Sequence, residues 1–425
     1  MSELISKRMT MLRLGKGMTQ SQLGKEIGFA RSHIANFESG GYAPNERAVQ
    51  DYCQFFKVPS NYFKEHLFCT EVEDSLQRLF NHLLHEESVA ANDELSSMPP
   101  FILNLEQEHS FYLLKAALHY GKRELEKAKQ IEEDYLIVFQ EDDVDSMTTF
   151  SQKCYYLYEA EKNYFFGNYR NAISNWKILS NLENCIVKLI RVSLRIIVCY
   201  FRSQNYVTVY SLAKEAVGQL EEMELPLLLA KAYALLSASY NQLNLFQESL
   251  IVLNKMEALI NKYNLTNEKH ILYGNRGYIY NKCGRLSDAL GNYQKALEIA
   301  TTIERSISAI ISNIHCLIAL RQYNIAEEYL KEMRSFGLNE REKMIALSYE
   351  AELLLYQGEE KKSWKMQKIA LDFFIENGCT HNLSYIYSQL AQHYLEKNMF
   401  KKAAFYLEKK EETIHEKNKI LLARA

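Results

Sequence analysis

The stretch from Tyr273 to Leu297 constrains the fold most, because small and large apolar residues recur at helical spacing on both sides of a glycine. Gly277 and Tyr280 lie three residues apart, on one face of an expected first helix, and Gly284 then interrupts the pattern. One face of an expected second helix is lined by Leu286, Ala289, Tyr293 and Ala296. Small residues stand where two helices must approach closely, and large ones fill the space between them. The stretch therefore predicts a pair of packed helices.

The same pattern recurs along the chain at a steady period. The expected second helices open at Tyr169, Tyr206, Phe246, Leu286, Tyr323, Glu360 and Phe400. Successive starts are 37 or 40 residues apart. The pattern resembles the tetratricopeptide repeat, a two-helix unit of about 34 residues that must stack because it cannot bury its apolar face alone. An irregular helical bundle is the alternative. The period favours an all-α fold with a superhelical solenoid.

Residues 1–66 do not follow this repeat and predict five short helices. Thr19 is a good N-cap for a helix from Gln20 to Ile27, and Gly28 ends that helix. A further helix is expected from Ala30 to Ser39. Two short helices joined by a tight glycine turn are typical of a helix-turn-helix.

This segment resembles the DNA-binding domain of the lambda-repressor/Cro type. The matching residues are Thr19, Gln20, Leu23, Ile27, Gly28, Ile34, Glu38, Gly40 and Pro44. Gly24 departs from the pattern, which usually has alanine there. The resemblance implies that the third helix enters the major groove. The residues expected to contact DNA are Gln20, Arg31, Ser32, His33 and Asn36. For any one of them, an ordinary solvated face is an equal alternative.

The charge balance bears on how such a domain would bind DNA. The 425-residue chain has a net charge of −3, whereas residues 1–66 hold nine Lys or Arg and six Asp or Glu, a formal charge of +3. This bias is modest. We therefore expect affinity to need two copies of the domain, that is, a homodimer on a double-stranded DNA operator with two half-sites.

The chain is expected to have three parts. Residues 1–66 form the helix-turn-helix DNA-binding domain, and residues 67–100 form a linker with a helix from Glu71 to His85 and a polar loop from Ser88 to Pro100. Residues 101–425 form the tetratricopeptide-repeat domain for peptide sensing and dimerisation.

Polar residues at corresponding positions of the first helices are expected to line the concave side of the solenoid. Asparagine amides can bond both the N–H and the C=O of an extended peptide, and basic side chains can hold a carboxylate. The predicted peptide-binding residues are Arg195, Arg202, Lys231, Asn241, Asn275, Tyr278, Asn281, Ser312 and His315. A polar solvated face is again the alternative.

The two halves together resemble the peptide-sensing quorum regulators of Gram-positive bacteria, of the PlcR and NprR type, with Rap, Rgg and PrgX relatives. The resemblance implies a cytoplasmic, homodimeric transcription regulator. A short signalling peptide would bind the repeats and move two DNA-reading heads relative to each other.

Other classes of function find less support in the sequence. No catalytic constellation, metal-ligand set or cofactor motif occurs, and no segment resembles a signal peptide or membrane span. We therefore expect no enzyme, metal, cofactor or membrane association. Two alternatives stay open. One is a response-regulator phosphatase of the Rap type, for which Gln77 is a candidate by location only. The other is a repeat scaffold that binds a protein partner.

Overall fold

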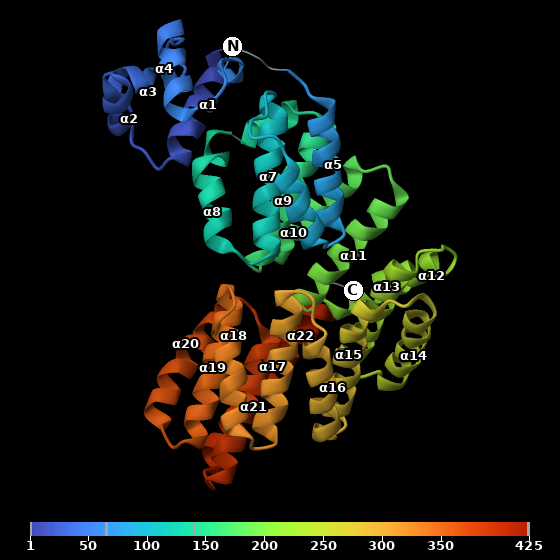
Figure 1. Cartoon of the computed structure of the whole chain (residues 1–425). Coiled ribbons are helices and arrows are strands. Elements are labelled where there is room, and N and C mark those ends of the chain that lie inside the picture. Colours follow the sequence, from blue (N-terminus) through green and yellow to red (C-terminus); the bar gives the residue numbers. More distant parts are fainter. Residues whose placement is uncertain (1, 64–66, 140, 423–425) are drawn as a thin grey trace. The chain divides into compact units, whose positions relative to one another are not determined.

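The computed structural model describes residues 2–63, 67–139 and 141–422, and over these residues the chain forms helices and no strands. The chain divides into two compact units, Met1–Ile196 and Ile197–Ala425. The boundary falls inside one helix, α11 (Ile186–Arg202). Within each unit, most helices pack against the next helix in the chain (Figure 1). The predicted all-α fold is confirmed.

The first unit begins with the helix-turn-helix domain and continues into helical pairs. Its elements before α11 are α1 (Ser2–Gly15), α2 (Gln20–Ile27), α3 (Arg31–Glu38), α4 (Glu46–Phe56), the 3-10 helix η1 (Ser60–Phe63), α5 (Thr70–Leu84), α6 (Ser88–Ser97), α7 (Leu105–Gly121), α8 (Leu125–Asp134), η2 (Leu136–Val138), η3 (Glu141–Ser146), α9 (Thr149–Phe165) and α10 (Tyr169–Leu182). Four α-helices and η1 enclose a core that includes Leu23, Ile34, Tyr52 and Phe63. The five-helix prediction is therefore confirmed.

The prediction of a loop from Ser88 is wrong for residues 88–97, which form α6. The stretch is polar because α6 contributes few large apolar side chains to the interior. Ala91, which is fully buried, lets α6 lie close to its neighbours α5 and α7. Arg78 of α5 also forms an ion pair with Glu94 of α6 at 2.9 Å.

The second unit holds the remaining helical pairs. Its elements after α11 are α12 (Tyr206–Glu221), α13 (Pro226–Gln242), α14 (Phe246–Tyr263), η4 (Thr266–Glu268), α15 (Lys269–Lys282), α16 (Leu286–Glu298), α17 (Ile303–Ala319), α18 (Tyr323–Arg334), α19 (Glu340–Tyr356), α20 (Glu360–Glu376), α21 (Thr380–Glu396) and α22 (Phe400–Leu422). All seven predicted starts of second helices, one of them in the first unit, agree with the structure.

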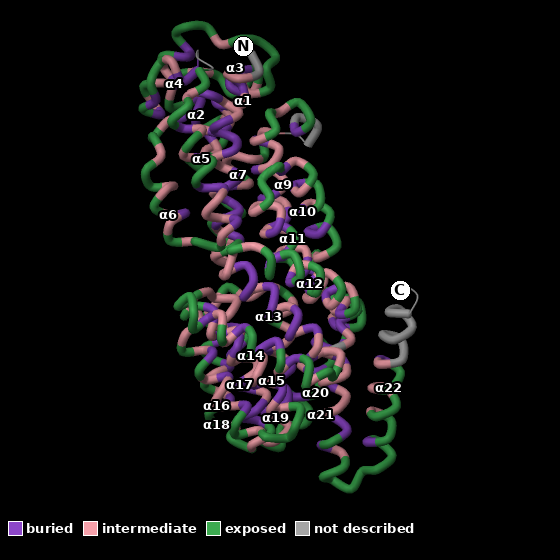
Figure 2. The backbone as a smooth tube through the Cα atoms, turned by 90° about the vertical axis from the view of Figure 1, so that its right-hand side faces the viewer, coloured by how far each residue is buried: buried purple, intermediate pink, exposed green. Residues whose placement is uncertain are grey.

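The close approach predicted at Gly277 is present. A Cβ atom on Gly277 would lie 2.7 Å from Cε1 of Tyr293, so only glycine leaves room for that ring. Tyr293 itself is 4% exposed and packs with Ala289 and Cys316. Helix α13 is buried along much of its length (Figure 2), as expected for a helix packed between neighbouring repeats. Nowhere in the described part of the chain is a helix both long and apolar enough to cross a bilayer.

Candidate functional site

The turn between α2 and α3 is built by local sequence signals. Thr19 caps α2 in a capping box, because its hydroxyl accepts from the Gln22 N–H at 3.2 Å while Gln22 Oε1 accepts from the Thr19 N–H at 2.8 Å. Gly28 ends α2 with φ +78°, a conformation that favours glycine. A Cβ atom on Gly24 would lie 2.4 Å from the carbonyl oxygen of Phe29, so the unusual glycine permits the tight turn.

The helix that follows the turn presents its polar face outward. Arg31, Ser32, His33 and Asn36 are all exposed, whereas Ile34 and Phe37 of the same helix are buried in the domain core. The His33 ring lies edge-on to Phe29 and Tyr42. Four of the five residues predicted to contact DNA therefore share one exposed surface on α3.

The fifth, Gln20, has a different environment. Its side-chain amide donates a hydrogen bond of 3.0 Å to Glu38, and it is half-buried. Glu38 also forms a two-pronged ion pair with Arg13, whose Nε and Nη2 lie 2.6 and 2.8 Å from the two carboxylate oxygens. Arg13 Nη1 donates to the Met18 carbonyl at 2.7 Å. This group ties α1, α2 and α3 together, so Gln20 has a structural role as well.

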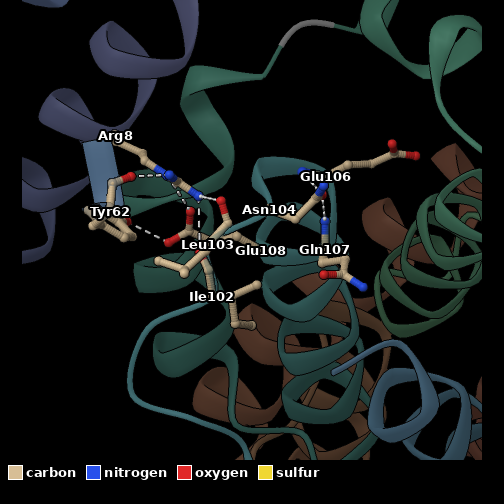
Figure 3. Close-up of polar contacts among 8 residues, drawn as sticks. All are labelled: Arg8, Tyr62, Ile102, Leu103, Asn104, Glu106, Gln107 and Glu108. Carbon is tan, nitrogen blue, oxygen red and sulfur yellow. Dashed lines mark hydrogen bonds and ion pairs between the residues drawn. The ribbon is translucent and has the colours of Figure 1, made fainter. Parts of the chain in front are cut away.

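A buried ionic cluster joins the helix-turn-helix domain to the first helix of the repeats (Figure 3). Arg8 of α1 is fully buried, and its Nε donates to Glu108 of α7 at 3.1 Å. Its Nη2 donates to the carbonyls of Ile102 and Leu103 at 3.0 and 2.7 Å. Nη1 donates to the carbonyl of Tyr62, whose hydroxyl in turn donates to Glu108 at 2.5 Å.

Burial raises the pKa of the Glu108 carboxyl, although the Arg8 guanidinium and the Tyr62 hydroxyl oppose the shift. The same burial raises the pKa of Tyr62 well above its ordinary value. Because a buried charge is costly unless it is paired, Arg8 and Glu108 each depend on the other. The cluster therefore holds three separate segments of the chain in one arrangement.

A second contact lies further along α1. A Cβ atom on Gly15 would lie 2.7 Å from the hydroxyl oxygen of Tyr135, so the end of α1 lies directly against this ring. Tyr135 stacks on Tyr112 of α7 with ring centroids 3.9 Å apart. Lys7 Nζ lies 5.1 Å from the centre of the Phe139 ring. Helix α1 is thus held at two places along its length.

In the second unit, Asn241 and Asn275 lie together and bridge two first helices. Asn275 Nδ2 of α15 donates to the Ala234 carbonyl of α13 at 3.2 Å, and Asn241 Nδ2 of α13 donates to the Asn275 carbonyl at 3.4 Å. Asn241 is buried, and its Oδ1 has no hydrogen-bond partner among the described residues. Asn275 is half-buried. Asn241 and Asn275 therefore lie next to each other, and their amides already bond between α13 and α15.

Other predicted residues lie on the same series of first helices. Burial raises the pKa of Tyr293, and the side chains of Asn281 on α15 and Ser312 on α17 oppose the shift. Burial raises the pKa of Tyr278 to about 12, although the Gln242 side chain opposes the shift. The His315 ring lies 5.1 Å from the Tyr385 ring, and burial lowers the pKa of His315 to about 4, so this imidazole is neutral at pH 7. These polar side chains connect neighbouring repeats.

The predicted basic residues are not gathered into one cluster. Arg195 belongs to the first unit, where it pairs with Glu86 at 2.8 Å and with Glu161. Arg202 belongs to the second unit, where it pairs with Glu304. Lys231 is half-buried on α13. Carboxylates of the protein thus already pair with both arginines.

A buried carboxyl group outside the predicted peptide-binding residues lies further along the second unit. Glu352 of α19 is 2% exposed, and its Oε2 accepts a 2.7 Å hydrogen bond from the Tyr385 hydroxyl. Its Oε1 has no partner within the described part of the chain. Burial raises the pKa of Glu352 to about 8, so the group is largely protonated at pH 7.

The candidate for phosphatase chemistry, Gln77, is exposed on α5. It lines a hollow of about 230 Å³ together with Phe80, Thr149, Phe150, Lys153, Glu183 and Lys188. Lys153 and Glu183 pair with each other at 3.1 Å. In the described ranges, no cluster of His, Cys, Asp or Glu has the arrangement of a metal site.

Comparison with known proteins identifies the N-terminal domain. Residues 10–63 match the helix-turn-helix family. No curated protein matches the chain by sequence. The chain therefore carries a helix-turn-helix DNA-binding domain, and α3 occupies the position of the helix that reads DNA in such domains.

Solved structures share the fold of the longer part of the chain. A Rap protein complexed with competence and sporulation factor has a TM-score of 0.65 at 12% identity, covering 84% of this chain and 100% of that chain. NprR in complex with its cognate peptide NprX has a TM-score of 0.56 at 12% identity, covering 80% and 96%. The Rap conjugation gene regulator of plasmid pLS20 with the Phr* peptide has a TM-score of 0.56 at 15% identity, covering 82% and 96%. At these identities the likeness establishes the fold, a tetratricopeptide-like solenoid.

Proposed function

We propose that this protein is a homodimeric, DNA-binding transcription regulator controlled by a short signalling peptide that binds the first helices of its repeats. The observation that carries the proposal is the exposed polar face of α3 on a helix-turn-helix domain that is joined by buried contacts to a solenoid. Structures of this solenoid fold include complexes with NprX and with the Phr* peptide. These relatives support the peptide as the controlling ligand.

The DNA half of the proposal assigns base contacts to α3. The Arg31 guanidinium can donate two hydrogen bonds to guanine O6 and N7, and the Asn36 amide can pair with adenine. Ser32 and His33 lie beside them on the exposed face. Gln20, at the start of α2, is assigned a phosphate contact.

Arg31→Ala should weaken specific operator binding by about 1–3 kcal/mol, because one bidentate base contact is lost. Footprinting on a duplex selected by the wild-type protein from a random pool measures this change. Lys25→Ala, which removes an exposed charge from α2, is the matched control and should shift binding to all duplexes equally. An unchanged footprint for Arg31→Ala would remove α3 as the reading helix.

The peptide half assigns the backbone of the ligand to Asn241 and Asn275. Asn241 Oδ1, which has no hydrogen-bond partner among the residues that the structure describes, can accept from a peptide N–H. Breaking the two bonds that join α13 and α15 would free both amides for the ligand. Further contacts with the ligand are assigned to four residues of α15 and α17, namely Tyr278, Asn281, Ser312 and His315. Arg202 and Lys231 are assigned to carboxylates of the ligand, with Glu304 displaced from Arg202.

Asn275→Ala should lower peptide affinity about tenfold without changing helical content, because one or two hydrogen bonds are lost. Calorimetry with the best binder from a set of synthetic heptapeptides measures the affinity. Asn292→Ala is the control, since the Asn292 amide on α16 donates to the Asp288 carbonyl of its own helix at 2.8 Å. Equal affinities for both variants would place the ligand elsewhere. Acceleration of phospho-response-regulator hydrolysis that depends on Gln77 would favour the phosphatase alternative instead.

A further inference from the structure

We propose that Arg8, Tyr62 and Glu108 are positioning residues for DNA binding, which hold the DNA-reading domain at one angle on α7 and thereby select the spacing of operator half-sites. This inference rests on the proposed function. It concerns residues that lie away from the exposed face of α3 and that make no base contact in that proposal.

The first step is the nature of the attachment. One guanidinium bonds the carboxylate of Glu108 and the carbonyls of Tyr62, Ile102 and Leu103. Its partners come from η1, from the segment that enters α7, and from α7 itself (Figure 3). Arg8 is 0% exposed and Glu108 is 5% exposed. Tilting the domain on α7 would break the bonds of Arg8 to Glu108, Ile102 and Leu103 and the bond of Tyr62 to Glu108. Because a buried charge that loses its partner is costly, these bonds hold the domain at one angle.

The second step is the presence of another contact on the same helix. Arg8 lies in the middle of α1, and Gly15 at its end meets the Tyr135 ring. Phe101 and Leu103 also pack against the core of the helix-turn-helix domain. Two contacts about seven residues apart along a helix lie roughly 10 Å from each other, and together they fix the direction of its axis.

The third step links this direction to DNA. Half-sites read by paired helix-turn-helix domains are separated by about 34 Å or a multiple of it, one turn of the duplex. A DNA-binding domain on a flexible linker would bind half-sites at many separations with similar free energy. A domain fixed to α7 accepts the one separation that the dimer presents. Through the buried cluster, the geometry of the repeats therefore determines which half-site spacing the dimer binds.

The test compares Arg8→Met, Glu108→Gln and the control Arg78→Met in the full-length chain. The control breaks the Arg78–Glu94 ion pair of the same unit, which is partly exposed and lies between α5 and α6. The probes are a duplex selected by the wild-type protein from a random pool, the same duplex with five base pairs inserted between its half-sites, and a duplex with one half-site. Circular dichroism checks folding.

We expect the two cluster variants to bind the single half-site within twofold of the wild type. Their preference for the selected duplex over the lengthened one should fall at least tenfold, whereas Arg78→Met keeps it. A change in half-site affinity alone would show a merely structural role and overturn the inference. So would an unchanged spacing preference in Glu108→Gln, which is the deciding variant if Arg8→Met fails to fold. If the wild type binds no duplex, the proposed function fails as well; if it binds without spacing preference, only this inference fails.

Discussion

Glu352→Gln should make the protein more stable than the wild type at pH 8, by about 2–4 kcal/mol in free energy of unfolding. Burial raises the pKa of Glu352 from 4.5 to about 8. Between these two values the folded protein holds a proton that the unfolded chain has released. Wild-type stability therefore falls as the pH rises through this window, and is constant with respect to this group above it. Glutamine does not titrate and can still accept the hydrogen bond of Tyr385.

Urea unfolding at pH 5 and at pH 8 measures the effect. The two proteins should have similar stability at pH 5 and diverge at pH 8. Glu350→Gln, at a half-buried position of the same helix, is the control and should change stability little at either pH, because both side chains of the Glu350–Arg334 pair are partly exposed to solvent. A Glu352→Gln protein that is less stable than the wild type at pH 8 would mean that this carboxyl is ionised and paired in the fold.

Arg13→Met should destabilise the helix-turn-helix domain by about 3–5 kcal/mol, because it leaves the Glu38 carboxylate buried without its cation. The Glu38 side chain is 5% exposed, and Arg13 contacts its two carboxylate oxygens at 2.6 and 2.8 Å. Glu38 also receives the Gln20 amide. Loss of the pair should therefore release α1 from α3 and abolish DNA binding.

Hydrogen exchange resolved along the chain measures this result, since amides of α1 to α4 should lose protection while those of α13 to α21 keep it. Peptide affinity should remain at the wild-type level. The matched control is Arg47→Met, whose pair with Asp51 spans 3.9 Å with the Arg47 side chain 87% exposed. Equal protection of α1 to α4 in the Arg13→Met and Arg47→Met proteins would contradict the assigned role of Glu38.

Local patterns in the sequence predict the helices of this protein well. The starts of all seven second helices follow from apolar spacing, and α2 follows from Thr19 and Gly28, because these signals act within a few residues. Helix α6 was missed because its buried side is small and its other residues are polar. The exposure of Arg31 and Asn36 also follows from the period of α3.

Side-chain partnerships across the chain were not predictable in the same way. Arg8 and Glu108 are 100 positions apart, and nothing local to either residue marks it as buried. Arg195 and Arg202 lie seven residues apart on α11, and only the fold shows that each has its own carboxylate partner. Helical periodicity indicates which face a residue occupies. It does not indicate whether a polar group on that face meets solvent, a ligand or another part of the protein.

The two intervals between second helices, 37 and 40 residues, differ by three, which is close to the 3.6 residues of one helical turn. Lengthening a repeat by such a step changes the angular position of its packed residues by only about 60°. A step of one or two residues would rotate them by about 100° or 160° and bring polar groups against Tyr293 and its counterparts. Repeat arrays of this kind can therefore diverge in length by whole turns while each unit still fits its neighbour.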